Sequence, residues 1–228
     1  MARQRARILD LVSSKEGIVY KAFIFDFDGV LVDTTEIQVR SILEALSKRG
    51  FEISHPSNME IVRSTITTKA KLLKFCDKGY INMDQVENIY EDKKQIANRM
   101  MLDLDPQHYF DKRQMFDFLK EEDKRIAIVT NANGESTRML LEHLGFMEYL
   151  DVLITNNDVA NPKPHPEPYI RALMYLARIG CDLDECIIFE DSTVGLEAAR
   201  ATGASVYEVK NWTDTNFGLV SNIMWRSE

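Results

Sequence analysis

Short apolar runs alternate with amphipathic helical patterns along most of this chain, and this alternation is the feature that most restricts its fold. The runs are KAFIFDF, RIAIVTN, LDVLITN, ECIIFED and ASVYEV, and each is bounded by turn residues. Apolar runs of this length are typical of strands that are buried on both faces of a parallel sheet. We therefore expect an α/β fold, in which helices cover a doubly wound, Rossmann-like parallel sheet.

One interval interrupts the alternation. From about residue 37 to residue 105 the sequence has helical patterns and no convincing strand. We therefore expect an inserted helical domain within the Rossmann-like core. The predicted division is residues 1–34 with 105–228 for the core, and residues 35–104 for the insertion.

Charge and cysteine content limit the partners and the compartment. The formal net charge is −8, with 36 acidic and 28 basic residues, and such a chain repels nucleic acid. No apolar stretch approaches the roughly 18 residues that a membrane span requires. The three cysteines include no CxxC pair, which favours a reducing compartment over a disulfide framework. We expect a cytoplasmic monomer without a nucleic-acid or membrane partner.

The N-terminal segment MARQRAR is rich in arginine and precedes the first acidic residue, Asp10. It has neither an apolar h-region nor a serine-rich body. A surface helix is therefore favoured over a transit peptide, and the role of residues 1–19 stays open.

Carboxylates and other polar groups stand at the ends of three predicted strands, where open α/β sheets bind their ligands. Four carboxylates at one partly dry site repel each other by several kcal/mol, on the order expected at a low effective dielectric. A divalent cation removes this repulsion, and magnesium is favoured because it takes oxygen ligands beside a substrate phosphate. The residues are Asp26 and Asp28, Thr130 and Asn131, and Glu190 and Asp191.

Lys163 lies in the segment NPKPHPEPY, where four of the six prolines of the chain fall within seven residues. Proline fixes φ and carries no N–H donor, so such a segment is stiff. A stiff segment can hold one lysine in place, and we predict a positioned Lys163 instead of a solvated loop residue. Together with Lys163, the strand-end aspartates indicate chemistry and not merely turns capped by aspartate.

Four motifs occur in order: DFDGVLVDT, VTNA, PKPHPEPY and FEDSTVGLEAA. With them the chain resembles the haloacid dehalogenase superfamily of phosphatases and phosphomutases. It is similar to members with a helical cap inserted after the first strand, such as phosphoglycolate phosphatases and β-phosphoglucomutases. The resemblance covers roughly residues 20–210, and segment 35–104 matches the cap in position more than in sequence.

This resemblance implies a phosphatase that hydrolyses a small phosphate monoester through an aspartyl-phosphate. Asp26 would be the nucleophile that attacks phosphorus in line. Asp28 would protonate the departing alcohol and then take a proton from the attacking water. Gly29 would let the strand end bend, so that both carboxylates flank one phosphorus atom.

The resemblance also implies Mg²⁺ as the cofactor. Its ligands would be Asp191, Asp26 and the backbone carbonyl of Asp28. Glu190 would be either a further ligand or a residue that orients one.

The remaining motif residues would bind the transferring phosphoryl group. Thr130 and the backbone N–H of Asn131 would donate hydrogen bonds to its oxygens, and Lys163 would balance charge there and on the nucleophile. The implied partner is a small phosphorylated metabolite.

The polar segment RSTITTK lies between two helical patterns, where cap loops of this family face the active site. We predict that Arg63 or Lys69 contacts an anionic or hydroxylated end of the substrate. The alternative is that both are ordinary exposed residues. The sequence does not identify the substrate.

Two other functions stay open. A β-phosphoglucomutase-like sugar phosphomutase is the main alternative, but those mutases carry a histidine on the first cap helix where this chain has Gln38. A phosphate-binding module without turnover is disfavoured because the motif set is intact, namely Asp26, Asp28, Thr130, Lys163 and Asp191. Dehalogenation is disfavoured because dehalogenases lack an aspartate at the position of Asp28.

Overall fold

The computed structural model describes residues 19–53, 55–64 and 66–224, so the predicted N-terminal helix lies outside the described residues. The described residues divide into two compact units. The core unit is the described part of residues 1–33 and 105–228, and the helical unit is the described part of residues 34–104. Thr34 thus belongs to the helical unit, one residue away from the predicted boundary.

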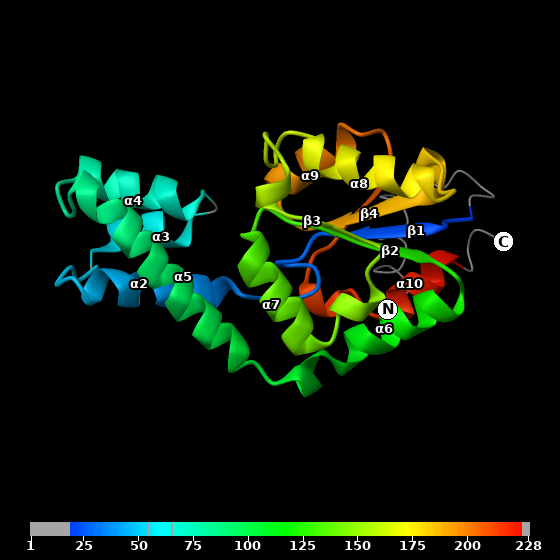
Figure 1. Ribbon diagram of the computed structural model, residues 1–228, viewed down its shortest axis with the longest axis horizontal. Coiled ribbons are helices and arrows are strands. Elements are labelled where there is room, and N and C mark those ends of the chain that lie inside the picture. Colours follow the sequence, from blue (N-terminus) through cyan, green and yellow to red (C-terminus); the bar gives the residue numbers. More distant parts are fainter. Residues whose placement is uncertain (1–18, 54, 65, 225–228) are drawn as a thin grey trace, which may run out of the picture. The chain divides into compact units, whose positions relative to one another are not determined.

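A parallel sheet forms the centre of the core unit (Figure 1). Among the described residues it has five strands in the order β3-β2-β1-β4-β5. Their bounds are β1 (Ala22–Phe25), β2 (Arg125–Val129), β3 (Val152–Ile154), β4 (Cys186–Glu190) and β5 (Ser205–Glu208). The predicted doubly wound α/β fold is confirmed. Because β1 pairs with both β2 and β4, the carboxyl ends of these three strands meet at one edge.

Helices cover both faces of this sheet. The helices α8 and α9 pack together on one face, and α6 and α10 pack together on the other (Figure 1). The bounds are α6 (Phe110–Glu121), α7 (Gly134–Leu144), α8 (Glu167–Arg178), α9 (Thr193–Arg200) and α10 (Phe217–Met224). A short 3₁₀ turn, η2 (Pro106–Tyr109), leads into α6.

Apolar packing holds the sheet against α8. One buried cluster joins Ile24, Val129 and Ile188 of the three central strands to Tyr169 and Leu176 of α8. The residues of β5 are only half-buried, because this strand lies at the edge of the sheet. The other edge strand, β3, has two half-buried residues among its three. The expectation that all apolar runs form buried strands is therefore wrong for β5 and only partly met by β3.

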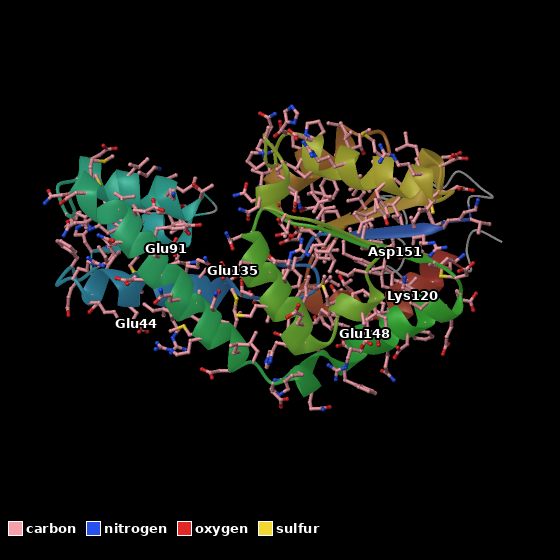
Figure 2. All side chains as sticks on the ribbon, viewed as in Figure 1. Glu44, Glu91, Lys120, Glu135, Glu148 and Asp151 are labelled. Atoms are coloured by element: carbon pink, nitrogen blue, oxygen red, sulfur yellow. The ribbon has the colours of Figure 1, made fainter. Side chains whose placement is uncertain are left out.

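Asp151 connects α6 to the sheet at the edge opposite the carboxyl ends of the strands. Its carboxylate accepts hydrogen bonds from Lys120 Nζ at 2.7 Å, Arg125 Nη1 at 3.2 Å and the Ile126 backbone N–H at 2.8 Å. Figure 2 shows Lys120 of α6 beside Asp151, which directly precedes β3. These bonds fix the starts of β2 and β3, and hence the register that aligns their other ends.

The helical unit has a hydrophobic core of its own. Buried side chains from its helices, among them Ile42, Leu46, Leu72, Phe75 and Ile89, form one cluster. As predicted, the described residues of this unit contain helices and no strand. The helices are α2 (Thr35–Ser47), α3 (Pro56–Arg63), α4 (Thr68–Asp77) and α5 (Val86–Leu102).

Across the described part of both units, no helix combines the length and apolar character that a bilayer span requires.

Candidate active site

The carboxyl edge of the sheet brings together the acids that the sequence places at strand ends. Asp26 directly follows β1, Glu190 is the last residue of β4, and Asp191 comes next. Each of these three side chains offers a carboxylate oxygen, and the three oxygens lie within 4.8 Å of one another. Because β1 and β4 are neighbours in register, the strands themselves impose this proximity.

Lys163 lies at the centre of the site. Its Nζ is 2.6 Å from Asp26 Oδ1, 2.8 Å from Glu190 Oε1, 2.8 Å from the Val129 carbonyl oxygen and 2.9 Å from the Tyr169 hydroxyl. The side chain is 3% exposed. The structure therefore holds this lysine in a fixed position, against the residue predicted to be the nucleophile.

Burial and charge oppose each other among these groups. Burial lowers the pKa of Lys163, but the charges of Asp26 and Glu190 outweigh it and leave this pKa above its usual value. Burial raises the pKa of Asp26, although Lys163 acts in the other direction. Burial and the charge of Glu190 raise the pKa of Asp191 to about 6. The three carboxyl groups therefore outnumber the one ammonium group, and the raised pKa values show that their charged forms are disfavoured without a further counter-charge.

Glu190 has its hydrogen-bonding capacity filled by the protein. Oε1 accepts from Lys163 Nζ at 2.8 Å and from the Tyr169 hydroxyl at 3.1 Å. Oε2 accepts from the Ser192 backbone N–H at 3.0 Å and from Ser192 Oγ at 3.1 Å. A carboxylate has about four lone-pair positions, and all four are used here. The sequence leaves two roles open for Glu190, a further metal ligand or a residue that orients a ligand. This fully buried side chain suits the orienting role.

The oxygens that remain for a cation come chiefly from Asp26 and Asp191. Both are carboxyl groups, they stand close together, and the raised pKa of Asp191 indicates that its charged form lacks a counter-charge. Hard divalent cations prefer such oxygen donors. The donor set therefore fits a divalent cation.

The turn after β1 is built around Gly29. The Gly29 N–H donates to the Val32 carbonyl at 2.7 Å, and the Leu31 N–H donates to the Phe27 carbonyl at 3.0 Å. Gly29 has φ of +88°, and a Cβ atom there would lie 2.1 Å from Asp191 Oδ2. Only glycine satisfies both the left-handed backbone and the close approach. The predicted bend is therefore present after Asp28, and the absence of a side chain at Gly29 leaves room for Asp191.

Thr130 and Asn131 follow β2 at the same edge. Thr130 is 3% exposed, and its Oγ1 accepts a hydrogen bond from the Ala132 N–H at 3.0 Å. The Asn131 side chain forms a reciprocal pair with the Lys163 backbone: its Nδ2 donates to the Lys163 carbonyl, and its Oδ1 accepts from the Lys163 N–H, each at 3.0 Å. Asn131 thus positions Lys163 through its side chain, which sequence reasoning missed. No local pattern relates two residues that lie so far apart in the chain.

Sequence reasoning also missed Tyr169. A signal was present, because Tyr169, Ala172 and Leu176 repeat at helical spacing on the face of α8 that is buried. A buried tyrosine hydroxyl needs a hydrogen-bond partner. The pattern therefore indicated a polar partner in the core, although it could not identify Lys163 or Glu190. Burial and the charge of Glu190 raise the pKa of Tyr169 well above its usual value, so the hydroxyl keeps its proton.

Arg63 and Lys69 belong to the helical unit, and both are exposed. Arg63 is the last residue of α3. Lys69 Nζ forms an ion pair with Glu87 Oε2 at 2.9 Å and lies 4.8 Å from the centre of the Tyr90 ring. Their contact with a substrate stays a prediction.

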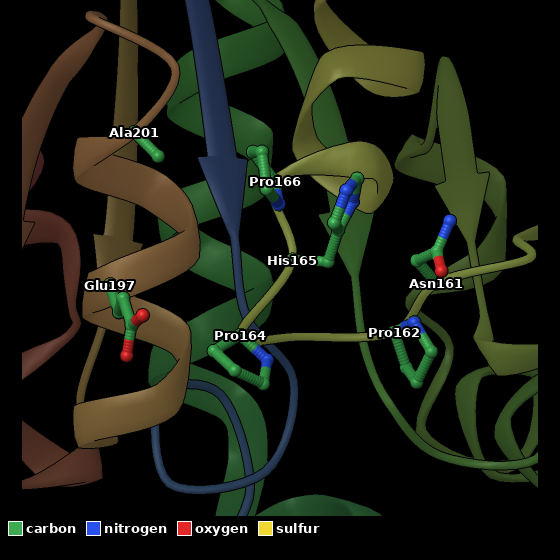
Figure 3. A pocket seen from close by; sticks show the side chains of 7 residues that line it. All are labelled: Asn161, Pro162, Pro164, His165, Pro166, Glu197 and Ala201. Carbon is green, nitrogen blue, oxygen red and sulfur yellow. The ribbon is translucent and has the colours of Figure 1, made fainter.

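A hollow of about 470 Å³ lies beside the segment that carries Lys163. Figure 3 shows it between residues 161–166 and α9, with Pro164 and Glu197 on its two sides. None of the clustered acids lines it. The hollow is therefore a neighbour of the candidate active site and not the site itself.

The close packing of α9 against Glu190 gives a testable prediction. A Cβ atom at Gly195 would lie 1.8 Å from Glu190 Oε1. Because four hydrogen bonds hold Glu190, we expect Gly195→Ala to lower the free energy of unfolding by at least about 2 kcal/mol, measured by urea denaturation. Gly218→Ala in α10 is the control, because its Cβ would meet only the Asn216 side chain, at 3.2 Å. Equal stabilities of the two variants would contradict this account of Glu190.

Two curated proteins with similar sequences are named phosphatases. Phosphorylated carbohydrates phosphatase of Thermotoga maritima is 28% identical over 191 residues, which cover 80% of this chain and 82% of that protein. Fructose-1-phosphate phosphatase YqaB of Escherichia coli is 25% identical over 198 residues, which cover 84% of this chain and 97% of that protein.

Solved structures share the fold. The crystal structure of β-phosphoglucomutase from Clostridium difficile matches with a TM-score of 0.71 at 19% identity, over 89% of this chain and 96% of that chain. The family model described as haloacid dehalogenase-like hydrolase matches residues 23–209, from β1 to just beyond β5. Because this match spans well over half of the sequence, the chain belongs to the haloacid dehalogenase-like hydrolases and is an enzyme of that family.

Proposed function

We propose that this enzyme is a magnesium-dependent phosphatase, which hydrolyses a small phosphate monoester through an aspartyl-phosphate on Asp26. The observation that carries the proposal is the buried contact of 2.6 Å between Lys163 Nζ and Asp26 Oδ1, with Asp191 beside it. The named phosphatases among its relatives support the same reaction class.

Asp26 is suited to attack phosphorus. Lys163 binds Oδ1, which leaves Oδ2 to act as the nucleophile. The side chain is only 10% exposed, so few water molecules must be removed before the attack. The attack forms a bond between Asp26 and phosphorus and breaks the bond to the leaving alcohol. This splits one difficult hydrolysis into two easier steps.

Asp28 is suited to move the protons of both steps. It is half-buried, and the hydrogen-bonded turn around Gly29 holds its backbone. In the first step it donates a proton to the alcohol oxygen as that bond breaks. In the second step it accepts a proton from the water that attacks the aspartyl-phosphate, which restores its starting state.

Three groups are suited to bind the oxygens of the phosphoryl group. The Thr130 hydroxyl accepts from a backbone N–H and has its own proton to donate. The backbone N–H of Asn131 stands at the same strand end. Lys163 supplies positive charge, and donors already in place need no reorganisation during the reaction.

Mg²⁺ would be held by Asp26, Asp191 and the backbone carbonyl of Asp28. When bound, this ion supplies positive charge that neutralises the phosphoryl oxygens as charge develops on them. Glu190 is the orienting residue, because it fixes Lys163 and the turn at Ser192, next to Asp191.

The proposed partner is a small phosphorylated metabolite, bound by a monomer in the cytoplasm. The free thiols of Cys76, Cys181 and Cys186 support a reducing compartment. In the helical unit, Arg63 and Lys69 are the proposed contacts to the substrate end remote from phosphorus.

The phosphomutase alternative finds less support in the helical unit. The Gln38 amide receives a hydrogen bond from Lys93 Nζ and donates one to Thr34 Oγ1 at 3.2 Å. An amide cannot exchange a proton at neutral pH, as the histidine of the mutases can. The resemblance to a solved mutase is one of fold alone at 19% identity.

The first prediction from the proposed function concerns the nucleophile and the metal. We expect phosphate release from a panel of sugar phosphates, phosphoglycolate and nucleoside monophosphates in magnesium. EDTA should abolish this release and excess Mg²⁺ should restore it, because the acids lose their counter-charge without the ion. Asp26→Asn should lower kcat by at least about 10⁴-fold, because the amide cannot form the acyl phosphate.

The matched control is Asp184→Asn, which changes an exposed aspartate of the core unit. It should retain wild-type kcat and KM. Release that persists in Asp26→Asn, or that EDTA leaves unchanged, would refute the proposed mechanism. If the wild type releases no phosphate from any monoester, isomerisation of β-glucose 1-phosphate is the next assay.

The second prediction concerns Asp28. We expect Asp28→Asn to lower kcat/KM for an alkyl phosphate by about 10²–10⁴-fold, because the alcohol then leaves without a proton. The rate of the first step should fall much less with p-nitrophenyl phosphate, because its leaving group needs no proton. Stopped-flow measurement should then show a burst of p-nitrophenolate before slow turnover. Equal losses with both substrates would contradict the acid role.

The third prediction concerns the helical unit. Arg63→Ala and Lys69→Ala should raise KM for the best substrate several-fold and change kcat less, because a remote contact contributes mainly to binding. Loss of the exposed Lys69 and Glu87 ion pair should affect stability little. Lys74→Ala, an exposed lysine of α4, is the control. Unchanged KM and kcat in both test variants would remove these residues from the substrate site.

A further inference from the structure

Tyr169 spans two environments. Its ring is fully buried in the apolar cluster between α8 and the sheet. Its hydroxyl emerges from this cluster at the acidic site, 2.9 Å from Lys163 Nζ and 3.1 Å from Glu190 Oε1. The ring centre lies 4.6 Å from the same ammonium group. One side chain therefore anchors in the core and contacts two charged residues of the site.

The hydrogen bonds around Lys163 outnumber its protons. An ammonium group has three N–H donors. Four acceptors lie within 2.9 Å of Nζ: Asp26, Val129, Glu190 and Tyr169. The Tyr169 hydroxyl differs from the other three because it also donates, and its proton is directed to Glu190 Oε1. It thus links the lysine and the glutamate in a closed triangle of hydrogen bonds.

We infer that Tyr169 is a positioning residue for the proposed reaction, whose hydroxyl holds the Lys163 ammonium group against Asp26. The inference rests on the proposed function for the role of Lys163 in catalysis. The hydrogen-bond triangle itself is a property of the folded protein.

The surplus acceptor matters when the charge on Asp26 changes. As Asp26 bonds to phosphorus its carboxylate loses negative charge, and its hydrogen bond to Lys163 weakens. Val129, Glu190 and Tyr169 then provide one acceptor for each of the three protons. The ammonium group therefore stays in place through both steps, beside the phosphoryl oxygens that it neutralises.

The test is Tyr169→Phe, which removes the hydroxyl and keeps the ring. The matched control is Tyr175→Phe, the same change at an exposed tyrosine on α8. We expect Tyr169→Phe to lower kcat by about tenfold, as for the loss of one hydrogen bond to a charged group, with KM within about twofold of wild type. Tyr175→Phe should match wild type in both. A purely structural role of Tyr169 would leave kcat of the folded variant unchanged.

A second measurement does not depend on activity. In protein labelled with ¹⁵N-lysine, a buried and hydrogen-bonded ammonium group exchanges its protons slowly and gives its own signal, which Lys163→Met should remove. We expect this signal to shift and broaden in Tyr169→Phe and to be unchanged in Tyr175→Phe. An unchanged signal in Tyr169→Phe would overturn the inference.

The two measurements separate the possible failures. If wild type releases no phosphate, the proposed function fails, and the lysine signal still decides whether Tyr169 holds Lys163. If Tyr169→Phe does not fold, the inference is tested on the wild-type protein instead. Its Lys163 ammonium signal should show a nuclear Overhauser effect to the Tyr169 ring protons. The absence of that effect would overturn the inference.

Discussion

The ammonium group of Lys163, enclosed between two buried carboxylates, is the interaction on which the rest of the site depends. Without it, the ends of β1 and β4 would place Asp26 and Glu190 side by side with no counter-charge. Removing one partner of a buried ion pair is strongly destabilising, because the remaining charge is left uncompensated. The same group binds the Val129 carbonyl at the end of β2. One lysine therefore stabilises the carboxyl edge of the sheet and prepares the nucleophile.

That lysine is itself positioned from three directions. The Asn131 amide holds its backbone, the Tyr169 hydroxyl contacts its head group, and Glu190 is saturated by hydrogen bonds, so it cannot turn away. The alignment of strand ends brings Asn131 and Glu190 to Lys163, although 32 and 27 positions separate them from it in the chain. Precision at the site is thus a consequence of sheet register, which the apolar strands determine.

Much of this arrangement could be predicted from the sequence. Apolar runs that end in Asp26, Thr130 and Glu190 indicated both the parallel sheet and the edge at which the polar groups gather. Other features depend on geometry that no local pattern encodes. The side-chain role of Asn131, the saturation of Glu190 and the contact of Gly195 with that glutamate all require knowledge of which atoms meet in space. Tyr169 could be predicted in part, because its position on the helix indicated that it is buried but did not indicate its hydrogen-bond partners.

The division of the chain has a consequence for how such an enzyme diverges. The helical unit enters after Asp33 and returns at Asp105, and its hydrophobic cluster shares no residue with the cluster beneath the sheet. All the acids and the lysine proposed to carry the chemistry lie in the core unit. Under the proposed function, mutations in the insertion can therefore exchange one metabolite for another without disturbing the catalytic charges. Gene duplication can then produce enzymes of new specificity while selection preserves a single reaction.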